Sequence, residues 1–472
     1  MINLSVAEVA DVLGAKIDGA RTLPASLAFP AVSIDSRTIR KGECFVAFGG
    51  KRFNGHEFVE EALEKGASTV ILSQPPPCPE NWEDRLFLKV SDTEAALQTL
   101  AHYLRQRWGK SLVAISGSVG KTTTREFSAT LLGRRFKVVQ SPGNLNNEVG
   151  VPLSLLQISD EDEMAILELG MSHPGELRVL ARVCAPNAAI LTNVASVHTE
   201  FFADLDGIAS AKGEILEGLS PDGRFFFNAD DPRLCALASN YSGEKVSFSL
   251  DQPSDVRISN YGFENLGSMS FDLELKGSPL RASAPLVGRH FLYNIAAAVA
   301  VATEFGVSTD EIIEGISCLK VPSMRGEILR FNQGNEDPIT VWDDSYNSSP
   351  MALNMVLETV GELSGFRRKI LALGEMLELG PNSPQLHLEA GHAVARCGAD
   401  RLVTVGQGGI SIGQGAEAKG FPSEKIVHFE SSREAAEFLA DQLAPGEFLL
   451  VKGSRGVGMD RVIRRLEKRG EN

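Results

Sequence analysis

A glycine-rich turn between an apolar run and the start of a helix constrains this sequence more than any other feature. The stretch LVAISGSVGKTTT, residues 112–124, opens with apolar and β-branched residues that predict a buried strand. It turns through GSVG at residues 117–120 and predicts a helix from Lys121. Glycines let backbone N–H groups approach a phosphate, and the start of a helix attracts negative charge. The stretch therefore predicts a phosphate-binding turn in an α/β fold.

The residues after this turn have the chemistry of a nucleotide site. The ammonium group of Lys121 can reach the β- and γ-phosphates of a nucleotide, and the hydroxyl of Thr122 can bind Mg²⁺. The strict phosphate-loop pattern has a glycine where this sequence has Ile115, so the motif is a shortened form, G-x-x-G-K-T. The alternative is an ordinary Gly/Ser-rich turn from strand to helix, and the Gly-Lys-Thr sequence favours phosphate binding over it.

Composition and charge exclude several classes of function. The chain has 472 residues, and this length predicts about three globular domains. Its formal charge of −15 argues against unspecific binding to nucleic acid or to an anionic membrane, so an anionic substrate needs locally placed Arg and Lys. The six cysteines form no C-x-x-C pair, which predicts reduced thiols and no zinc site. Without a signal peptide or an apolar stretch of about 18 residues, we expect a cytoplasmic protein that does not insert into a membrane.

Strands and helices alternate along most of the chain, which predicts an α/β fold with mostly parallel sheets. We expect three domains, at residues 1–108, 109–320 and 321–472. The first is a small α/β domain, and the central one joins the phosphate loop and a parallel sheet to a small antiparallel addition. The last is a Rossmann-like domain, and it ends in a basic helix that we expect to be solvated.

Three further side chains follow successive strands of the central domain. Glu168 stands near the end of the apolar strand EMAILELG, where ligands of open α/β sheets gather, and a carboxylate there can hold the Mg²⁺ of a nucleotide. His198 and Lys212 come after the next strand. Taken singly, they have plainer interpretations: a carboxylate that caps a turn, a packed or surface histidine, and a solvated lysine. Their position after consecutive strands of a nucleotide fold favours a shared site.

One arginine in the first domain has the chemistry of a phosphate clamp. Arg37, beside Ser36 in the segment SIDSR, can bind phosphate through two parallel hydrogen bonds with support from the serine hydroxyl. Considered alone, Arg37 is better explained as a surface arginine in a turn.

Together these motifs resemble the Mur ligases, the ATP-dependent amino-acid or peptide ligases of bacterial cell-wall synthesis. The resemblance covers nearly the whole chain, and the motifs come in the family's order: GSVGKTTT, ELG, TNV with His198, AKGEI, GRHFLYN, SMRGE, DDSYNSSP and KGSRG. It implies an N-terminal UDP-binding domain, a central ATPase domain and a C-terminal ligase domain. Two positions depart from the family pattern: Asn54 replaces a common Asp in FNGHEF, and Ser-Met precedes Arg325 where Gly-Arg is common.

Within the family, the chain is similar to the branch that adds D-alanyl-D-alanine to UDP-N-acetylmuramoyl-tripeptide. GNLNNEVGVPLSLL resembles that branch's loop after the phosphate site, and DDSYNSSP resembles its DDSYN-x-x-P signature. The DNPR-type motif of the diaminopimelate-adding branch is not found in the C-terminal part. The implied partners are these two substrates, with other cell-wall enzymes as further candidates and no nucleic acid, and we expect a monomer. The third residue of the tripeptide, lysine or diaminopimelate, stays open.

The resemblance also implies a mechanism, in which the tripeptide carboxylate attacks the γ-phosphate of ATP and the dipeptide amine then attacks the acyl phosphate. Two Mg²⁺ ions are implied at Thr122, Glu168, His198 and Lys212, with Lys212 carbamylated because an ammonium group cannot bind Mg²⁺. The implied catalytic residues are Lys121, Glu168, His198 and Lys212. The implied ATP contacts are Gly117, Ser118, Val119, Gly120, Lys121, Thr122, Thr123, Asn294, Arg325 and Asp343. The implied substrate contacts are Ser36, Arg37, Asn146, Asn147, Tyr346 and Asn347.

Two other kinds of protein remain open. A ligase of the folylpolyglutamate type or of another Mur branch shares the central motifs, although the segments DSR and DDSYN argue against folate. A regulatory or scaffold protein that keeps the fold without ligation is expected to lose some of the four catalytic residues, and all four are present. Because the implied contacts come from three domains, we expect the domains to close on substrate and to shield the acyl phosphate from water.

Overall fold

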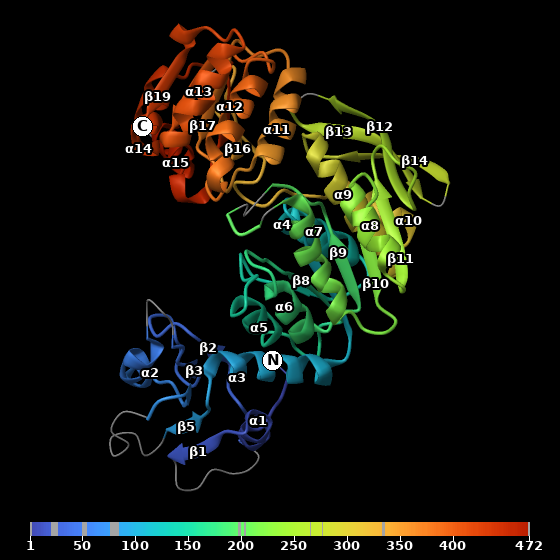
Figure 1. Cartoon of the computed structure of the whole chain (residues 1–472), viewed down its shortest axis with the longest axis vertical. Coiled ribbons are helices and arrows are strands. Elements are labelled where there is room, and N and C mark those ends of the chain that lie inside the picture. The colour runs from blue at the N-terminus through green and yellow to red at the C-terminus, as the bar shows by residue number, and fades with distance from the viewer. Residues whose placement is uncertain are drawn as a thin grey trace. The chain divides into compact units, whose positions relative to one another are not determined.

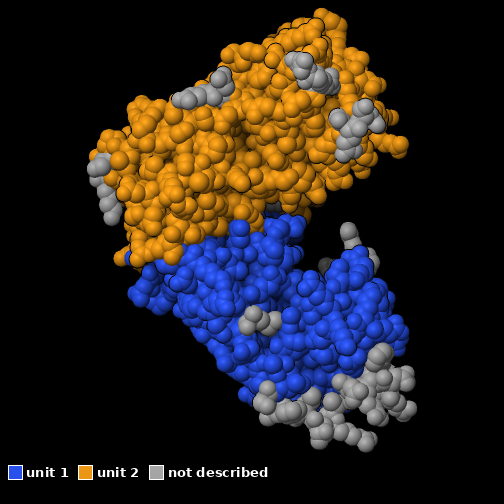
Figure 2. Space-filling model, turned by 180° about the vertical axis from the view of Figure 1, so that it is seen from behind, with its two compact units in different colours: residues 1–116, 136–189, 213–225 blue, residues 117–135, 190–212, 226–472 orange. Residues whose placement is uncertain are grey.

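The computed structural model describes residues 2–19, 27–49, 54–75, 85–196, 200–202, 204–264, 266–275, 277–332 and 336–470. It contains three β-sheets with helices beside them, which confirms the predicted α/β class (Figure 1). The chain divides into two compact units, coloured separately in Figure 2. Unit 1 comprises Met1–Ser116, Phe136–Ala189 and Gly213–Phe225, and unit 2 comprises Gly117–Arg135, Ile190–Lys212 and Phe226–Asn472.

The first part of unit 1 is a five-stranded sheet with the strand order β1-β5-β4-β3-β2. Neighbouring strands are parallel except β1, which pairs antiparallel with β5. Phe45, Val70 and Phe87 from three of these strands share one apolar core with helix α2. The elements are α1 (Val6–Leu13), β1 (Lys16–Gly19), β2 (Val32–Ser33), β3 (Cys44–Val46), α2 (Val59–Glu64), β4 (Thr69–Leu72), β5 (Leu86–Lys89) and α3 (Thr93–Trp108).

A nine-stranded sheet follows, with the strand order β14-β13-β12-β11-β10-β9-β6-β8-β7. Strands β6, β7 and β8 belong to unit 1, whereas β9 and β10 contribute residues to both units. Strand β8 pairs in parallel with β6 and β7, and its last residue is Glu168. The elements are β6 (Ser111–Ser116), α4 (Lys121–Leu132), β7 (Val138–Gln140), α5 (Gly150–Leu155), β8 (Met164–Glu168), α6 (Glu176–Cys184), β9 (Ala188–Leu191), α7 (Leu205–Gly213), β10 (Arg224–Asn228) and α8 (Pro232–Asn240).

The predicted antiparallel addition is present in unit 2. Strand β13 pairs antiparallel with both β12 and β14, while β11 runs parallel to β12. Every second residue of β13 is buried, at Met269, Phe271 and Leu273, as expected for a strand with one covered face. The elements are β11 (Glu244–Ser249), β12 (Val256–Glu264), β13 (Ser268–Leu275), β14 (Ser278–Ala284), α9 (Arg289–Glu304) and α10 (Thr309–Ser317).

The third sheet, also in unit 2, has the strand order β15-β16-β20-β17-β18-β19. All neighbouring strands are parallel except β15, which is antiparallel to β16. Helices cover both faces of this sheet, because Leu371 and Leu450 share a core with α11, α12 and α13, while Ile370 and Leu449 share one with α14 and α15. This is the doubly wound arrangement that the sequence predicts. The elements are β15 (Glu327–Phe331), β16 (Ile339–Asp344), α11 (Pro350–Glu362), β17 (Lys369–Gly374), α12 (Ser383–Val394), β18 (Arg401–Val405), α13 (Gln407–Ala418), β19 (Ile426–Phe429), α14 (Ser432–Gln442), β20 (Phe448–Lys452) and α15 (Asp460–Gly470).

The C-terminal helix α15 corrects one expectation. The sequence predicts a solvated basic helix, but Val462, Ile463 and Leu466 are buried in the same apolar core as α14. These three residues follow helical spacing, so one apolar stripe packs inward while the arginines face outward. Separately, no helix in the described parts of the chain is both long and apolar enough to cross a membrane.

Candidate active site

The phosphate loop adopts backbone conformations that require glycine. Gly117 has φ +144° and Gly120 has φ +87°, and L side chains rarely adopt such angles. A Cβ atom on Gly117 would lie 1.9 Å from Thr192 Oγ1, and one on Gly120 would lie 3.1 Å from the amide group of Asn294. Gly120 also precedes α4 without any side-chain cap, and the start of a helix attracts negative charge.

A short segment after β9 holds the phosphate loop in place. The backbone N–H groups of Ser118 and Val119 donate to the backbone and side-chain oxygens of Asn193, at 3.0 and 2.9 Å. Thr192 Oγ1 and Asn193 Nδ2 both donate to the carbonyl oxygen of Val119, at 2.6 and 3.0 Å. Thr192 and Asn193 belong to the TNV motif, which was singled out only as the strand before His198. Their role in positioning the loop was missed by the sequence analysis.

The side chains expected to meet phosphate lie at this loop. Lys121 Nζ donates to the carbonyl oxygens of Gly117 and Ser118, at 2.8 and 3.3 Å. Thr122 and Thr123 are buried in the first turn of α4. The ammonium group of Lys121 and the start of α4 therefore lie at the same loop, an arrangement that binds phosphate in other proteins.

Lys212 is not a solvated helix lysine. It lies in α7 with 2% of its surface exposed. Burial, followed by the positive charge of Lys121, holds the pKa of its ammonium group well below the usual range. The neutral amine is therefore favoured, and a neutral amine is the nucleophilic form of lysine.

In unit 1 the structure brings Asn146 and Glu168 together. Asn146 Nδ2 donates to Glu168 Oε1 at 2.8 Å, and Glu168 N donates to Ser141 Oγ at 3.0 Å. Glu168 is 3% exposed, at the carboxyl end of β8. Asn147 instead accepts a hydrogen bond from Gly150 N at 2.8 Å, which stabilises the turn before α5. The two neighbouring asparagines thus have different surroundings.

The two predicted UDP contacts, also in unit 1, already have internal partners. Ser36 is buried, and its hydroxyl donates to Glu61 Oε2 at 2.9 Å. The exposed guanidinium of Arg37 donates to both carboxylate oxygens of Asp35, at 2.9 and 2.7 Å. These hydrogen bonds from Arg37 lower the pKa of Asp35 to about 2. A phosphate would have to compete with this carboxylate for Arg37.

The C-terminal sheet contributes a buried ion pair at the end of two neighbouring strands. Lys452 Nζ, at the end of β20, lies 2.5 Å from Asp344 Oδ2, at the end of β16, and also donates to the carbonyl oxygen of Asn347 at 3.0 Å. The preceding residue, Asp343, is buried and accepts a hydrogen bond from Ser345 N at 3.1 Å. Burial raises the pKa of Asp343 to about 6.

Two arginines gather over one tyrosine ring at the same edge of this sheet. The guanidinium carbon of Arg325 lies 3.9 Å from the centre of the Tyr346 ring, and that of Arg455 lies 5.4 Å from it. Arg325 and Tyr346 are predicted site residues, whereas Arg455 was noticed only as part of the KGSRG motif. His198 lies outside the described residues.

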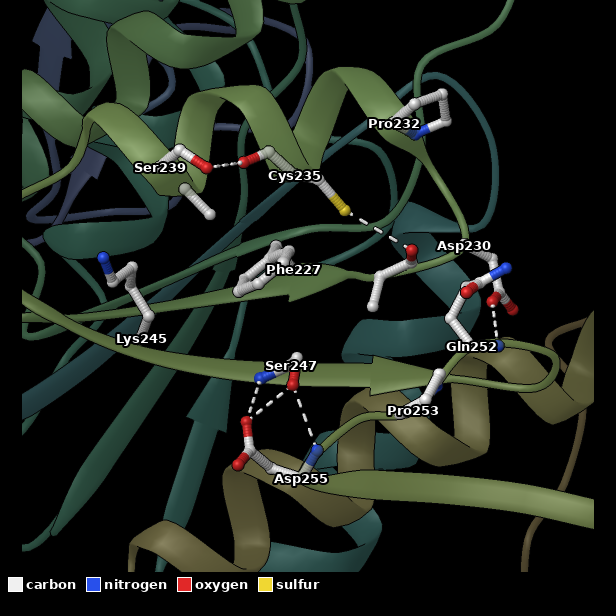
Figure 3. A pocket seen from close by; sticks show the side chains of 12 residues that line it. Phe227, Asp230, Pro232, Cys235, Ser239, Lys245, Ser247, Gln252, Pro253 and Asp255 are labelled. Atoms are coloured by element: carbon white, nitrogen blue, oxygen red, sulfur yellow. Dashed lines mark hydrogen bonds between the residues drawn. The ribbon is translucent and has the colours of Figure 1, made fainter.

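An open pocket of about 770 Å³ lies elsewhere in unit 2, between α8, β10 and the β11–β12 turn (Figure 3). Of the described residues that line it, only Lys245 is a cation. Its acidic residues serve local structure, because the carboxylate of Asp230 accepts hydrogen bonds from backbone N–H groups at residues 250–252 and that of Asp255 accepts from Ser247. Its charge is therefore unsuited to a nucleotide phosphate.

Models of three Mur ligase domains match the chain over most of its length. The domain described as the Mur ligase family, catalytic domain, matches residues 29–105, the Mur ligase middle domain matches residues 115–302, and the Mur ligase, glutamate ligase domain, matches residues 325–455. A curated relative from Bacillus subtilis, UDP-N-acetylmuramoyl-tripeptide–D-alanyl-D-alanine ligase, is 32% identical over 92% of both chains. The chain belongs to the Mur ligase family.

Solved structures of Mur ligases have the same fold. The structure of MurF from Acinetobacter baumannii matches with a TM-score of 0.87 and 27% identity, over 99% of both chains. The structure of the MurF ligase from Thermotoga maritima in complex with ADP matches with a TM-score of 0.82 and 29% identity, over 94% of this chain and 98% of that one. The predicted family and the predicted α/β fold are therefore confirmed for this Mur ligase.

Proposed function

We propose that this Mur ligase joins D-alanyl-D-alanine to UDP-N-acetylmuramoyl-tripeptide, with ATP converted to ADP and phosphate. The observation that carries the proposal is the similarity along the whole chain to a relative named for that reaction. The phosphate loop supports it, because Gly117, Gly120 and Lys121 are arranged as a site for the phosphates of ATP. The ADP complex of the Thermotoga maritima structure supports the choice of nucleotide.

The reaction requires two anions to meet. The tripeptide carboxylate attacks the γ-phosphorus of ATP, the bond to the β,γ-bridging oxygen breaks, and ADP leaves. The dipeptide amine then attacks the acyl carbon, the tetrahedral intermediate expels phosphate, and a peptide bond forms with loss of the amine proton. Lys121 and the N–H groups at the start of α4 lower the repulsion between the anions, since preorganised charge is the main catalytic device in phosphoryl transfer.

We propose Thr122, Glu168, His198 and Lys212 as the residues that hold Mg²⁺. A hydroxyl and a carboxylate suit this ion, which takes oxygen ligands. A carbamate on Lys212 would add oxygens of the same kind, and the lowered pKa of the lysine supports carbamylation because the reaction with carbon dioxide needs the neutral amine. When bound, Mg²⁺ supplies neutralisation of phosphate charge.

The remaining residues are proposed contacts for the ends of the substrates. Asn294, whose amide group faces Gly120, is assigned to the nucleotide base, and Arg325 and Asp343 to phosphate and ribose. Ser36 and Arg37 are assigned to the UDP end, and Asn146, Asn147, Tyr346 and Asn347 to the peptides. The division at residues 1–108, 109–320 and 321–472 and the closure of these domains on substrate belong to the same proposal, as does a monomeric state.

Phosphate release from ATP tests the proposed function. Purified protein with Mg²⁺ and UDP-MurNAc-tripeptide is expected to release phosphate only when D-Ala-D-Ala is added, with a pentapeptide product detected by mass. Parallel reactions with lysine-containing and diaminopimelate-containing tripeptides identify the third residue. Turnover with a single amino acid in place of the dipeptide would assign the chain to another branch, and tight ATP binding without turnover on any acceptor would favour a regulatory protein.

A further inference from the structure

A short segment between strand β10 and helix α8 contacts the residues that hold the phosphate loop. This segment, NADDP at residues 228–232, starts with the last residue of β10 and ends with the first residue of α8. Asp231 Oδ2 accepts a hydrogen bond from Val194 N at 2.7 Å, and Asn228 Nδ2 donates to the carbonyl oxygen of Thr192 at 3.3 Å. Both bonds join NADDP to the segment that directly follows β9.

The residues on either side of Val194 contact the phosphate loop. The carbonyl oxygen of Asn193 accepts a hydrogen bond from Ser118 N at 3.0 Å. Ala195 N donates to Ser118 Oγ at 2.9 Å, and that hydroxyl donates to the carbonyl oxygen of Ala195 at 3.1 Å. The N–H group of Val194, between these two residues, binds Asp231 instead. The segment after β9 is therefore held between the phosphate loop and Asp231.

The contact between Asp231 and Val194 is a strong one. Its acceptor is a carboxylate, and hydrogen bonds to charged groups contribute more to stability than those between neutral groups. Val194 is buried, so water is a poor replacement for this acceptor. An unpaired buried N–H group is costly, and loss of the acceptor therefore favours a shift of the segment after β9.

The two oxygens of the Asp231 carboxylate bind different partners. Oδ1 accepts from Arg233 N and Leu234 N, at 3.0 and 3.3 Å, and caps α8, whereas Oδ2 accepts from Val194 N. The neighbouring Asp230 instead accepts from backbone N–H groups of the β11–β12 turn (Figure 3). Serine or asparagine also caps a helix well, so the cap alone does not require the second oxygen of Asp231.

We infer that Asp231 is a positioning residue for ATP, which acts on the phosphate loop through the segment after β9. This inference rests on the proposed function, because that function places the phosphates of ATP at the loop. Asp231 holds Val194, and the neighbours of Val194 hold Ser118 in the loop. Loss of the second carboxylate oxygen lets the loop move and weakens ATP binding, whereas the dipeptide is bound as before.

Two substitutions separate the Val194 contact from the helix cap. Asp231→Asn keeps the shape of the side chain but has one acceptor oxygen instead of two, and Asp231→Ser keeps an oxygen for the cap but has none for Val194 N. The dissociation constant for ATP with Mg²⁺, measured by calorimetry on the full-length protein, should rise by about tenfold to a hundredfold, the range for a hydrogen bond to a charged group. In the ligation assay, KM for ATP should rise while kcat and KM for D-Ala-D-Ala stay unchanged.

Asp92→Ser is the matched control. Asp92 caps α3 through the same kind of bonds, accepting from Glu94 N and Ala95 N at 2.8 and 3.1 Å. This variant should lose no more than a little stability and should keep the wild-type affinity for ATP. Because both serine variants change a helix cap in the same way, their difference in ATP affinity isolates the contact with Val194.

Two results would overturn the inference. One is an Asp231→Ser protein that melts at the temperature of the control and binds ATP as tightly as the wild type. The other is an equal loss of ATP affinity in Asp231→Ser and Asp92→Ser, which would trace the effect to the caps. If Asp231→Ser does not fold, the affinity of Asp231→Asn decides. A wild-type protein that binds ATP but joins no dipeptide would refute the proposed ligation, while the comparison of ATP affinities still decides the role of Asp231.

Discussion

Thr192 Oγ1 lies 1.9 Å from the position that a Cβ atom on Gly117 would occupy, so the phosphate loop and the segment after β9 fit together only with glycine at residue 117. The same hydroxyl donates to Val119 O at 2.6 Å. One threonine thus both excludes a side chain from the loop and fixes its backbone. Phosphate binding in this Mur ligase therefore depends on a residue outside the glycine-rich motif.

The Gly117→Ala substitution should weaken ATP binding. The added methyl group must displace Thr192, and alanine is strained at φ +144°. We expect KM for ATP to rise by about fivefold to 150-fold, since a strain of roughly 1–3 kcal/mol falls on the loop. Adding Thr192→Ala should restore only part of the loss, because it removes the clash but not the strain. Unchanged ATP kinetics in Gly117→Ala would show that the loop rearranges freely.

The Lys212→Ala substitution should abolish ligation, and short carboxylic acids should restore part of the activity. Burial and the positive charge of Lys121 lower the pKa of Lys212, which favours the neutral amine that reacts with carbon dioxide. Because the amine becomes more completely protonated as the pH falls, carbamylation and activity should both decrease on acidification. Activity in buffer purged of carbon dioxide, with and without added bicarbonate, is the second measurement. Full activity of Lys212→Ala without any added acid would disprove carbamylation.

The buried carboxyl group of Asp343 should make stability depend on pH. Its pKa is raised from 3.8 to about 6, so the folded protein holds this proton more tightly than the unfolded chain does. Its contribution to stability is therefore present below pH 3.8 and is lost as the pH rises through 6. The loss amounts to at most about 3 kcal/mol at pH 7.5.

Asp343→Asn has no proton to lose and should remove this dependence. The melting temperature of Asp343→Asn minus that of the wild type should increase as the pH is raised from 4 to 7.5. The comparison is best made by thermal unfolding at several pH values in one buffer system. A difference in melting temperature that does not vary with pH would contradict the raised pKa.

Replacing only one partner of the Asp344–Lys452 ion pair should strongly destabilise the fold. Replacing Lys452 by Met leaves a buried carboxylate without its cation, and such a loss costs about 3–5 kcal/mol. Asp344→Asn should lower the free energy of unfolding by a similar amount, because it leaves the buried ammonium group of Lys452 without a carboxylate partner. The double variant should lose less than the sum of the two, which denaturant unfolding of all four proteins would measure. Additive losses would show that the two groups do not interact.

Local patterns in the sequence were sufficient for most of the elements and for the phosphate site. The apolar runs before the glycine-rich turn and in EMAILELG predicted β6 and β8, and Gly-Lys-Thr after a strand predicted the start of α4. Strands β15 and β19 were not predicted, because they are edge strands whose residues are mostly half-buried and lack a strong apolar pattern. The apolar stripe of α15 was likewise obscured by its arginines.

Residue types and their order along the chain determined the family, the nucleotide chemistry and the candidate residues of this protein. Only the tertiary structure decided the contacts, the burial and the neighbouring charges of those residues, because these come from segments that are far apart in the sequence. Thr192 fixes the loop of Gly117, Lys121 lowers the pKa of Lys212, and Arg455 joins Arg325 over Tyr346 only after the strands are ordered in their sheets. Short-range patterns report the conformation of the backbone, whereas burial and charge interactions exist only in the folded chain.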